Sequence, residues 1–174
     1  MIKIIILSEQ KNVQQKISSE QIERLISSAF ASTQYLKKVI QLHQLKQLFF
    51  QESQYDPYAA PKDPKNTARG IAQINKACAE FIGWTNWKTE WSNPEKSINY
   101  GTAWLDRLAQ DFIAHDGPLI STRTRIPSIC ILHLQYQYPA HRRTILKSIL
   151  SGDDDEWKRL IDLEKKIFFP NQSI

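Results

Sequence analysis

The stretch LFFQESQYDP, residues 48–57, places an acid on the buried face of a helix just before that helix ends. Phe49 lies three positions before Glu52 and Leu48 lies four, and residues at these spacings share one face of a helix. A carboxylate on that face leaves water, which costs free energy unless the group is paired or kept neutral. Glu52 is therefore either the acid of a functional site or an ordinary side chain at a fraying helix end.

The composition predicts one mainly α-helical domain. The chain has 174 residues, enough for a sizeable core, and its 41% apolar and 24% charged residues are ordinary for a globular protein. Glycines are few and long β-branched runs are missing, so little or no sheet is expected. The net charge of +5 favours anionic partners, but the basic residues are scattered and the run 153–156 is acidic. A nucleic-acid binder is therefore a weak alternative, and it predicts affinity that falls steeply with salt.

Targeting signals and metal motifs are not readable in the sequence. The aliphatic run Ile4–Leu7 is too short for a transmembrane segment or a signal-peptide core, so the export route stays unknown. Cys78 and Cys130 have no metal-binding or redox spacing, and both lie on apolar helical stripes. The sequence leaves open whether these two cysteines pair.

Hydrophobic periodicity predicts the order of the elements. A short strand or extended arm is expected at residues 2–7. Helices are expected over seven ranges: about 18–29, 33–52, 70–81, 98–112, 126–137, 141–150 and 154–168. Asp56-Pro57 closes the second helix, because the residue before proline is disfavoured in helical space. Residues 53–69 contain three prolines and are predicted to be a long loop. In the irregular segment 83–94, core packing is expected for at least two of its three tryptophans.

Three further motifs follow Glu52-Ser53 in order: Tyr55-Asp56-Pro57, ARGIAQI (68–74) and NPEKSINYGTAWL (93–105). Together they resemble the successive signatures of the soluble lytic transglycosylase family, which has the goose-type lysozyme fold. The usual forms are Glu-Ser, an aromatic-x-Pro step, Gly-Leu-Met-Gln, and a proline-acid step that leads into Asn-Ile-x-x-Gly-x-x-Tyr-Leu. The resemblance covers about residues 36–150. It implies a lysozyme-like domain over 36–174 with a long active-site loop, and an N-terminal arm and helix over 1–35, in one compact unit.

The resemblance implies an enzyme that cleaves the glycan strands of peptidoglycan in the periplasm or cell wall. Glu52 is the expected sole acid/base of a reaction that breaks the MurNAc–GlcNAc β-1,4 bond and yields a 1,6-anhydro sugar. The substrate's acetamido group replaces the second carboxylate that most glycosidases need, and no cofactor or metal is required. A hydrolytic muramidase and a non-catalytic glycan-binding domain on the same fold are the alternatives. A phage or secretion system would fit, with the N-terminal region docking on a carrier.

Other roles are carried over residue by residue. Ser53 is expected to support Glu52 or to contact the acetamido group, and the alternative is a helix-terminal hydroxyl. Gln73 matches a glutamine that lines the cleft and bonds sugar, unless it is an exposed helix glutamine. Gly70 is expected to permit a close backbone approach, with a plain helix-start glycine as the alternative.

The segment HLQYQYP, residues 133–139, stands where the family has an Ala-Tyr-Asn motif whose tyrosine bonds the catalytic carboxylate. Tyr136-Gln137 is the nearest match, and Tyr138 is a second option for the phenol. The flanking alanine and asparagine are absent. His133 is interpreted as a satisfied core histidine, with contact to sugar as the alternative.

Two departures from the family pattern carry expectations of their own. Ala72 replaces the usual methionine, which is expected to loosen the packing or to open a subsite. The loop 53–69 is slightly longer than usual and carries Lys62, Lys65 and Arg69. These cations are expected either to meet the carboxylates of peptide stems or to be solvated.

Overall fold

The protein is mainly helical, as predicted from its composition. The computed structural model describes residues 17–63, 65–152 and 155–170. No strand forms within these residues, and the one β-type pairing is an isolated bridge between Arg69 and Ile74. The arm expected at residues 2–7 lies outside the described residues.

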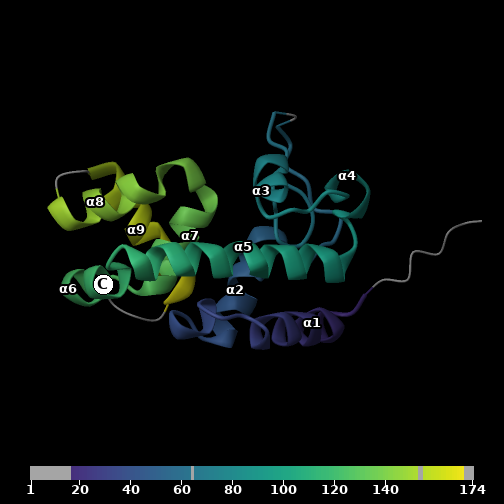
Figure 1. The fold of residues 1–174 in the computed structure, drawn as a ribbon, viewed down its shortest axis with the longest axis horizontal. Coiled ribbons are helices and arrows are strands. Elements are labelled where there is room, and N and C mark those ends of the chain that lie inside the picture. The colour runs from purple at the N-terminus through teal and green to yellow at the C-terminus, as the bar shows by residue number, and fades with distance from the viewer. Residues whose placement is uncertain (1–16, 64, 153–154, 171–174) are drawn as a thin grey trace, which may run out of the picture.

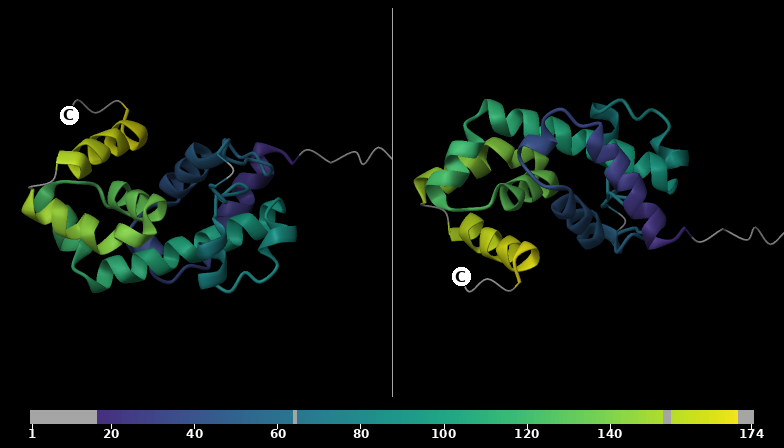
Figure 2. Two further views of the ribbon diagram at one scale, coloured as in Figure 1. Left: turned by 90° about the horizontal axis from the view of Figure 1, so that it is seen from above. Right: turned by 90° about the horizontal axis from the view of Figure 1, so that it is seen from below.

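The longest helix, α5, runs through the middle of the molecule (Figure 1). The α-helices are α1 (Ser19–Ala31), α2 (Leu42–Ser53), α3 (Lys76–Phe81), α4 (Trp87–Glu90), α5 (Pro94–Ala114), α6 (Gly117–Thr124), α7 (Ser128–Gln137), α8 (Arg142–Ser151) and α9 (Asp155–Phe168). Two 3₁₀ turns are η1 (Leu36–Lys38) and η2 (Pro139–His141). Helices α6 to α9 gather around one end of α5, and α3 and α4 lie at the other (Figure 2).

Two of the predicted helices form for the expected reasons. Ser18 caps α1 in a reciprocal pair with Gln21, and Ile22 and Ile26 are buried on its inner face. In α5, Asn93 caps the first turn, and the predicted stripe is buried: Ile98, Gly101, Leu105, Leu108 and Phe112. Because α1 and α2 pack together and α1 also packs on α5, α2 is held against the rest of the domain.

The helix predicted over 33–52 was wrong at its start. The chain makes the short turn η1 and then starts α2 at Leu42, because Gln41 caps that helix in a reciprocal pair with Gln44. Asp106 of α5 accepts hydrogen bonds from the backbone N–H groups of Tyr35 and Leu36, both at 2.7 Å. These bonds satisfy donors that would otherwise belong to a continuous helix.

The helix predicted over 70–81 was also wrong at its start. Residues 70–73 form a tight turn in which Gly70 has φ +74° and Gln73 has φ +46°. Asn75 then caps α3 by accepting from the N–H of Cys78. Phe81, the last residue of α3, is 61% exposed.

The C-terminal third contains one helix more than expected. Between the helices predicted over 98–112 and 126–137, Gly117-Pro118 open the additional helix α6. Helices α7, α8 and α9 form close to the predicted bounds. Both cysteines are buried and free, which answers the open question of their pairing.

The tryptophans of segment 83–94 pack as predicted. Trp84 is buried and its ring stacks on Tyr100 at 4.6 Å between centroids. Trp87 and Trp91 are partly buried against the hydrophobic core.

Candidate active site

Glu52 lies on the buried side of α2, one residue before the helix ends at Ser53. Its side chain is 14% exposed, and Phe49 and Leu48 on the same face are fully buried. The helix stops because Gln54 and Tyr55 both adopt positive φ, at +54° and +64°. The observed end lies one residue after the predicted end at Glu52 and before Asp56-Pro57. The left-handed pair turns the chain sharply away and leaves Glu52 at the edge of a cavity.

That cavity has a volume of about 260 Å³. Seven residues line it: Glu52, Asn66, Ala68, Gln73, Asn75, Tyr136 and Gln137. Four of the six predicted site residues therefore meet at one place, from segments up to 85 positions apart in sequence (52 to 137). Ser53 and Gly70 are not among the lining residues.

Gly70 and Gln73 shape the turn on one side of the cavity. A Cβ atom added to Gly70 would lie 2.3 Å from the carbonyl oxygen of Trp91, so glycine is required for a close backbone approach. The backbone that Gly70 approaches closely is therefore that of Trp91 in the same protein. The side-chain NH₂ of Gln73 donates to the carbonyls of Ala59 and Gly70, which leaves its Oε1 as the acceptor for a ligand.

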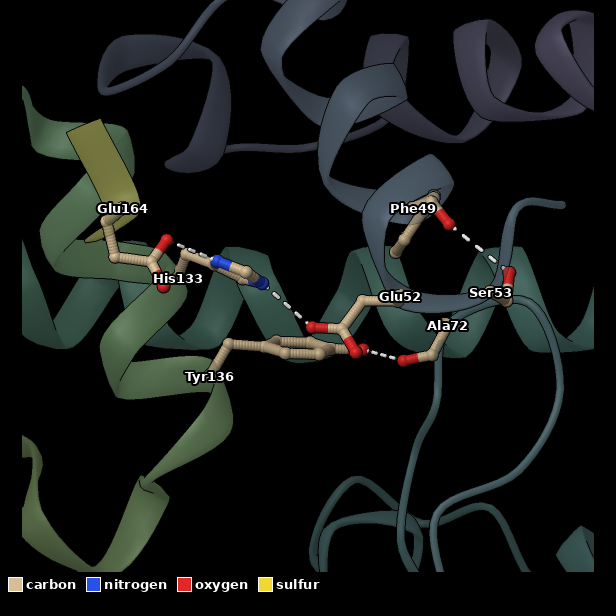
Figure 3. Close-up of polar contacts among 7 residues, drawn as sticks. All are labelled: Phe49, Glu52, Ser53, Ala72, His133, Tyr136 and Glu164. Carbon is tan, nitrogen blue, oxygen red and sulfur yellow. Dashed lines mark hydrogen bonds and ion pairs between the residues drawn. The ribbon is translucent and has the colours of Figure 1, made fainter. Parts of the chain in front are cut away.

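Ser53 faces away from the cavity. Its hydroxyl donates to the carbonyl of Phe49 at 3.2 Å, within its own helix (Figure 3). This geometry is the helix-terminal alternative stated for Ser53, and it gives Glu52 no support from that hydroxyl.

Tyr136 is the tyrosine that lies beside Glu52. Its ring lies next to the Glu52 carboxylate, but its buried hydroxyl donates to the carbonyl of Ala72 and not, as the resemblance had implied, to the carboxylate (Figure 3). Burial and the negative charge of Glu52 raise the pKa of Tyr136 well above its usual value. The second option, Tyr138, is 39% exposed and packs its ring edge against Trp157.

His133 and Glu164 complete the site; His133 was predicted to be a core residue, and no role was predicted for Glu164. Nε2 of His133 lies 2.8 Å from Oε1 of Glu52, and Nδ1 lies 2.5 Å from Oε2 of Glu164 (Figure 3). The imidazole is 2% exposed. Burial by itself would lower the pKa of His133, but hydrogen bonds and charge from Glu164 and Glu52 outweigh it and raise the pKa to about 9. The raised pKa therefore favours the protonated form of the His133 ring at neutral pH.

A signal for Glu164 was present in the sequence. It lies on the apolar stripe of α9, three residues after Ile161 and four before Phe168, both of which are buried. The spacing argument that singled out Glu52 applies equally to this acid. His133 was expected to be a satisfied core residue, and it is one, with two acids as its partners.

The two departures from the family pattern have structural outcomes. Ala72 is fully buried, its N–H donates to the Ser97 hydroxyl, and it does not line the cavity. It therefore opens no subsite there. Lys62 and Lys65 are exposed, whereas the Arg69 guanidinium donates to the backbone carbonyls of Asn66 and Ala68 and braces the loop.

A mainly helical domain with a largely buried acid at the edge of a polar cavity suits an enzyme that uses general acid–base catalysis. The family model described as "Transglycosylase SLT domain" matches residues 12–121, more than half of the chain. The chain therefore belongs to this family and is a lytic transglycosylase, an enzyme that cleaves peptidoglycan. Its site of action is accordingly the periplasm or the cell wall. Neither the curated proteins nor the solved structures contain a significant match to the chain.

The matched range includes α1, which the sequence analysis had left outside the resemblance, and it stops before α7. His133, Tyr136 and Glu164 all lie beyond the matched range. Within the described ranges 17–63, 65–152 and 155–170, no helix is both long and apolar enough to cross a membrane. In the same part of the chain, no cluster of three or more His, Cys, Asp or Glu side chains is arranged to hold a metal ion.

Proposed function

We propose that the protein cleaves the MurNAc–GlcNAc β-1,4 bond without water, with Glu52 as general acid and then general base. The observation that carries this proposal is that Glu52 is the single acidic side chain among the described residues that line the cavity. Most glycosidases place two carboxylates on either side of the scissile bond. A site with one cavity-lining carboxylate suits a reaction in which the substrate supplies its own nucleophiles.

The two acids in the loop after Glu52, Asp56 and Asp63, each stabilise a turn. Oδ1 of Asp56 accepts from the N–H of Tyr58 at 2.9 Å, and Oδ1 of Asp63 accepts from the N–H of Lys65 at the same distance. Both side chains are exposed. Their geometry gives both acids a turn-stabilising role and supports Glu52 as the sole acid/base of the site.

In the first step, Glu52 gives its proton to the glycosidic oxygen while the bond from that oxygen to the muramic acid anomeric carbon breaks. The substrate's acetamido oxygen stabilises the anomeric carbon. In the second step, the Glu52 carboxylate takes the proton of the carbon-six hydroxyl, and that oxygen closes the 1,6-anhydro ring. The carboxyl group ends in the protonation state in which it began, so no water is consumed.

Three amide side chains are placed to bind the sugar. Oδ1 of Asn66 accepts from the N–H of Ala68, and Oδ1 of Asn75 accepts from the N–H of Cys78, so each presents its NH₂ as a donor. Gln73 presents its Oε1 as an acceptor. Hydroxyl and acetamido groups of a glycan can bond to both kinds of atom, which supports a sugar substrate.

The test is digestion of purified peptidoglycan by the wild type and by Glu52→Gln, with mass spectrometry of the released fragments. The wild type is expected to produce 1,6-anhydro ends. Glu52→Gln is expected to lose roughly 10³-fold or more of the rate while it keeps its helical circular dichroism and its glycan binding. Glu95→Gln, at an exposed position in the first turn of α5, is the matched control and is expected to retain full activity.

Each contrary result has a distinct meaning. Reducing ends in place of anhydro ends would identify a hydrolytic muramidase. A wild type that binds glycan but does not cleave it would identify the non-catalytic alternative. Full activity in Glu52→Gln would exclude Glu52 as the acid.

A further inference from the structure

His133 links Glu52 to a second acid that lies outside the cavity. The imidazole comes from α7, Glu52 from α2 and Glu164 from α9, so three helices meet at one buried row of ionisable groups. Both ring nitrogens are in hydrogen-bond contact with a carboxylate oxygen. The Phe168 ring of α9 packs on the imidazole in a T-shaped arrangement, with 5.4 Å between the ring centroids.

Each of these two contacts must contain a hydrogen, because two oxygen or nitrogen lone pairs facing each other at 2.5–2.8 Å would repel. The row therefore holds two protons in its hydrogen bonds, one next to each carboxylate. When both reside on the ring, His133 is a cation that donates to Glu52 through Nε2 and to Glu164 through Nδ1. Charge-assisted hydrogen bonds of this kind are stronger than hydrogen bonds between neutral groups, and a low-dielectric interior strengthens them further.

We propose that His133, oriented by Glu164, is a positioning residue for Glu52: it holds Oε1, leaves Oε2 as the oxygen for proton transfer, and stabilises the carboxylate between the two steps. This inference rests on the proposed function. After Glu52 has given its proton to the leaving sugar, it carries a full negative charge in a poorly hydrated place. The Nε2–H of His133 is the donor that meets this charge. The carboxylate then recovers a proton from the carbon-six hydroxyl, so the row returns to its starting state.

Glu164 has two effects on the ring. Its carboxylate accepts the Nδ1 proton, which fixes the ring plane so that Nε2 points at Glu52. Its negative charge also helps to keep the ring protonated at the pH of the reaction. The other ionisable groups near this row are Tyr136 and Cys130 on α7, whose pKa values are both raised, and Lys165 on α9. Tyr136 and Cys130 are uncharged at neutral pH because their pKa values are raised, so the negative charge that faces His133 comes from Glu164 and, between the two steps, from Glu52.

The first test is the rate of anhydro-product formation by His133→Gln, which keeps an N–H donor but cannot carry the charge. The expected result is a fall in kcat on the order of 10²-fold with KM nearly unchanged, because the ring contacts Glu52 and not the substrate. His43→Gln, at an exposed position on α2, is the matched control and is expected to have wild-type kcat. An unchanged kcat in His133→Gln would overturn the proposal.

The second test separates positioning from packing. Glu164→Gln keeps an acceptor for Nδ1–H but removes one of the two anions that hold the proton on the ring. The alkaline limb of the kcat profile is expected near pH 9 in the wild type and at a lower pH in Glu164→Gln. Heteronuclear NMR of the His133 ring is expected to show the same downward shift. A purely structural role would leave the alkaline limb of kcat unchanged even though the ring titration shifts, and that result would overturn the proposal.

The two proposals fail in different ways. If the wild type makes no cleavage product, the proposed function fails, and the NMR titration still reports the charge of His133. If the wild type is active and Glu52→Gln is inactive but neither the His133 nor the Glu164 variant changes kcat or its pH profile, only this inference fails. If circular dichroism shows that His133→Gln does not fold, the pH profile of kcat in Glu164→Gln tests the proposal instead.

Discussion

The two sides of the cavity are built by different means. The N-terminal side, which is α2 with residues 66–75, is held by backbone geometry: positive φ at Gly70 and Gln73, and a turn whose carbonyls accept from a side-chain amide. The C-terminal side, which is α7 with α9, is held by buried ionisable side chains. The stability of the N-terminal side is therefore expected to depend on residues that tolerate unusual backbone conformations. The stability of the C-terminal side is expected to depend on pH. This difference can be tested by measurements of stability.

The largest effect is expected on the N-terminal side, from Gly70→Ala. The new Cβ would meet the Trp91 carbonyl at 2.3 Å, and alanine would have to adopt φ +74°. Strained backbone and overpacking together are expected to lower the free energy of unfolding by about 4 kcal/mol. Urea denaturation at pH 6, 8 and 10 would show the same loss at each pH, since no titrating group is involved.

Gly83→Ala is the matched control for this prediction. Gly83 has φ +77°, and an added Cβ would meet no atom of the described residues within 4 Å. The expected loss is only the backbone term, about 1 kcal/mol. Equal losses in the two variants would show that the approach to Trp91 adds nothing.

A smaller effect, and one that depends on pH, is expected on the C-terminal side. The folded protein raises the pKa of His133 from 6.5 to about 9. The folded state therefore binds the proton more tightly than the unfolded state, and this stability is fully present below about pH 6.5 and lost as the pH rises through 9. The shift corresponds to on the order of 3 kcal/mol at most.

The measurement is urea denaturation of the wild type and of His133→Gln across the same pH range. The stability advantage of the wild type is expected to shrink between pH 7 and pH 10, whereas the loss in Gly70→Ala stays constant. A constant advantage for the wild type would mean that the C-terminal side is held by shape and not by charge.

The smallest effect is expected where the two sides meet, at the hydrogen bond from Tyr136 to the carbonyl of Ala72. Tyr136→Phe leaves that buried carbonyl without its donor, which is expected to cost roughly 1–2 kcal/mol at every pH below the tyrosine pKa. Tyr138→Phe, on an exposed tyrosine of the same segment, is the control, with a change expected within about 0.5 kcal/mol. If Tyr138→Phe lost as much stability as Tyr136→Phe, the hydrogen bond to the Ala72 carbonyl would not be the cause of the loss in Tyr136→Phe.

The N-terminal side was largely predictable because its signals are local. The apolar spacing around Glu52 placed that acid on the buried face of α2, and the motif 68–74 placed Gln73 beside it. The predictions that were wrong on this side were the starts of α2 and α3. The helix predicted from Gly70 in fact begins after Asn75, which caps α3. Hydrophobic periodicity alone does not distinguish a tight turn from the first turn of a helix. The break at η1 depends on Asp106, a partner 70 positions away from Leu36.

The C-terminal side was predicted only in part because its partners are distant in sequence. His133 and Glu164 are 31 positions apart, and His133 and Glu52 are 81 apart. A histidine inside an apolar helix has the same local pattern whether a backbone carbonyl or a carboxylate satisfies it. The sequence therefore predicted that His133 would be buried and satisfied, but it could not identify the two groups that satisfy it.

The buried free cysteines have a consequence for the environment in which this enzyme works. Burial raises the pKa of the Cys78 thiol, and burial together with the nearby charge of Glu164 raises the pKa of Cys130 to about 12. Only the thiolate reacts with oxidants and disulfides, so both sulfurs are held in their unreactive form. The folded enzyme is thus expected to be indifferent to redox conditions, with the same thermal midpoint in dithiothreitol and in oxidised glutathione.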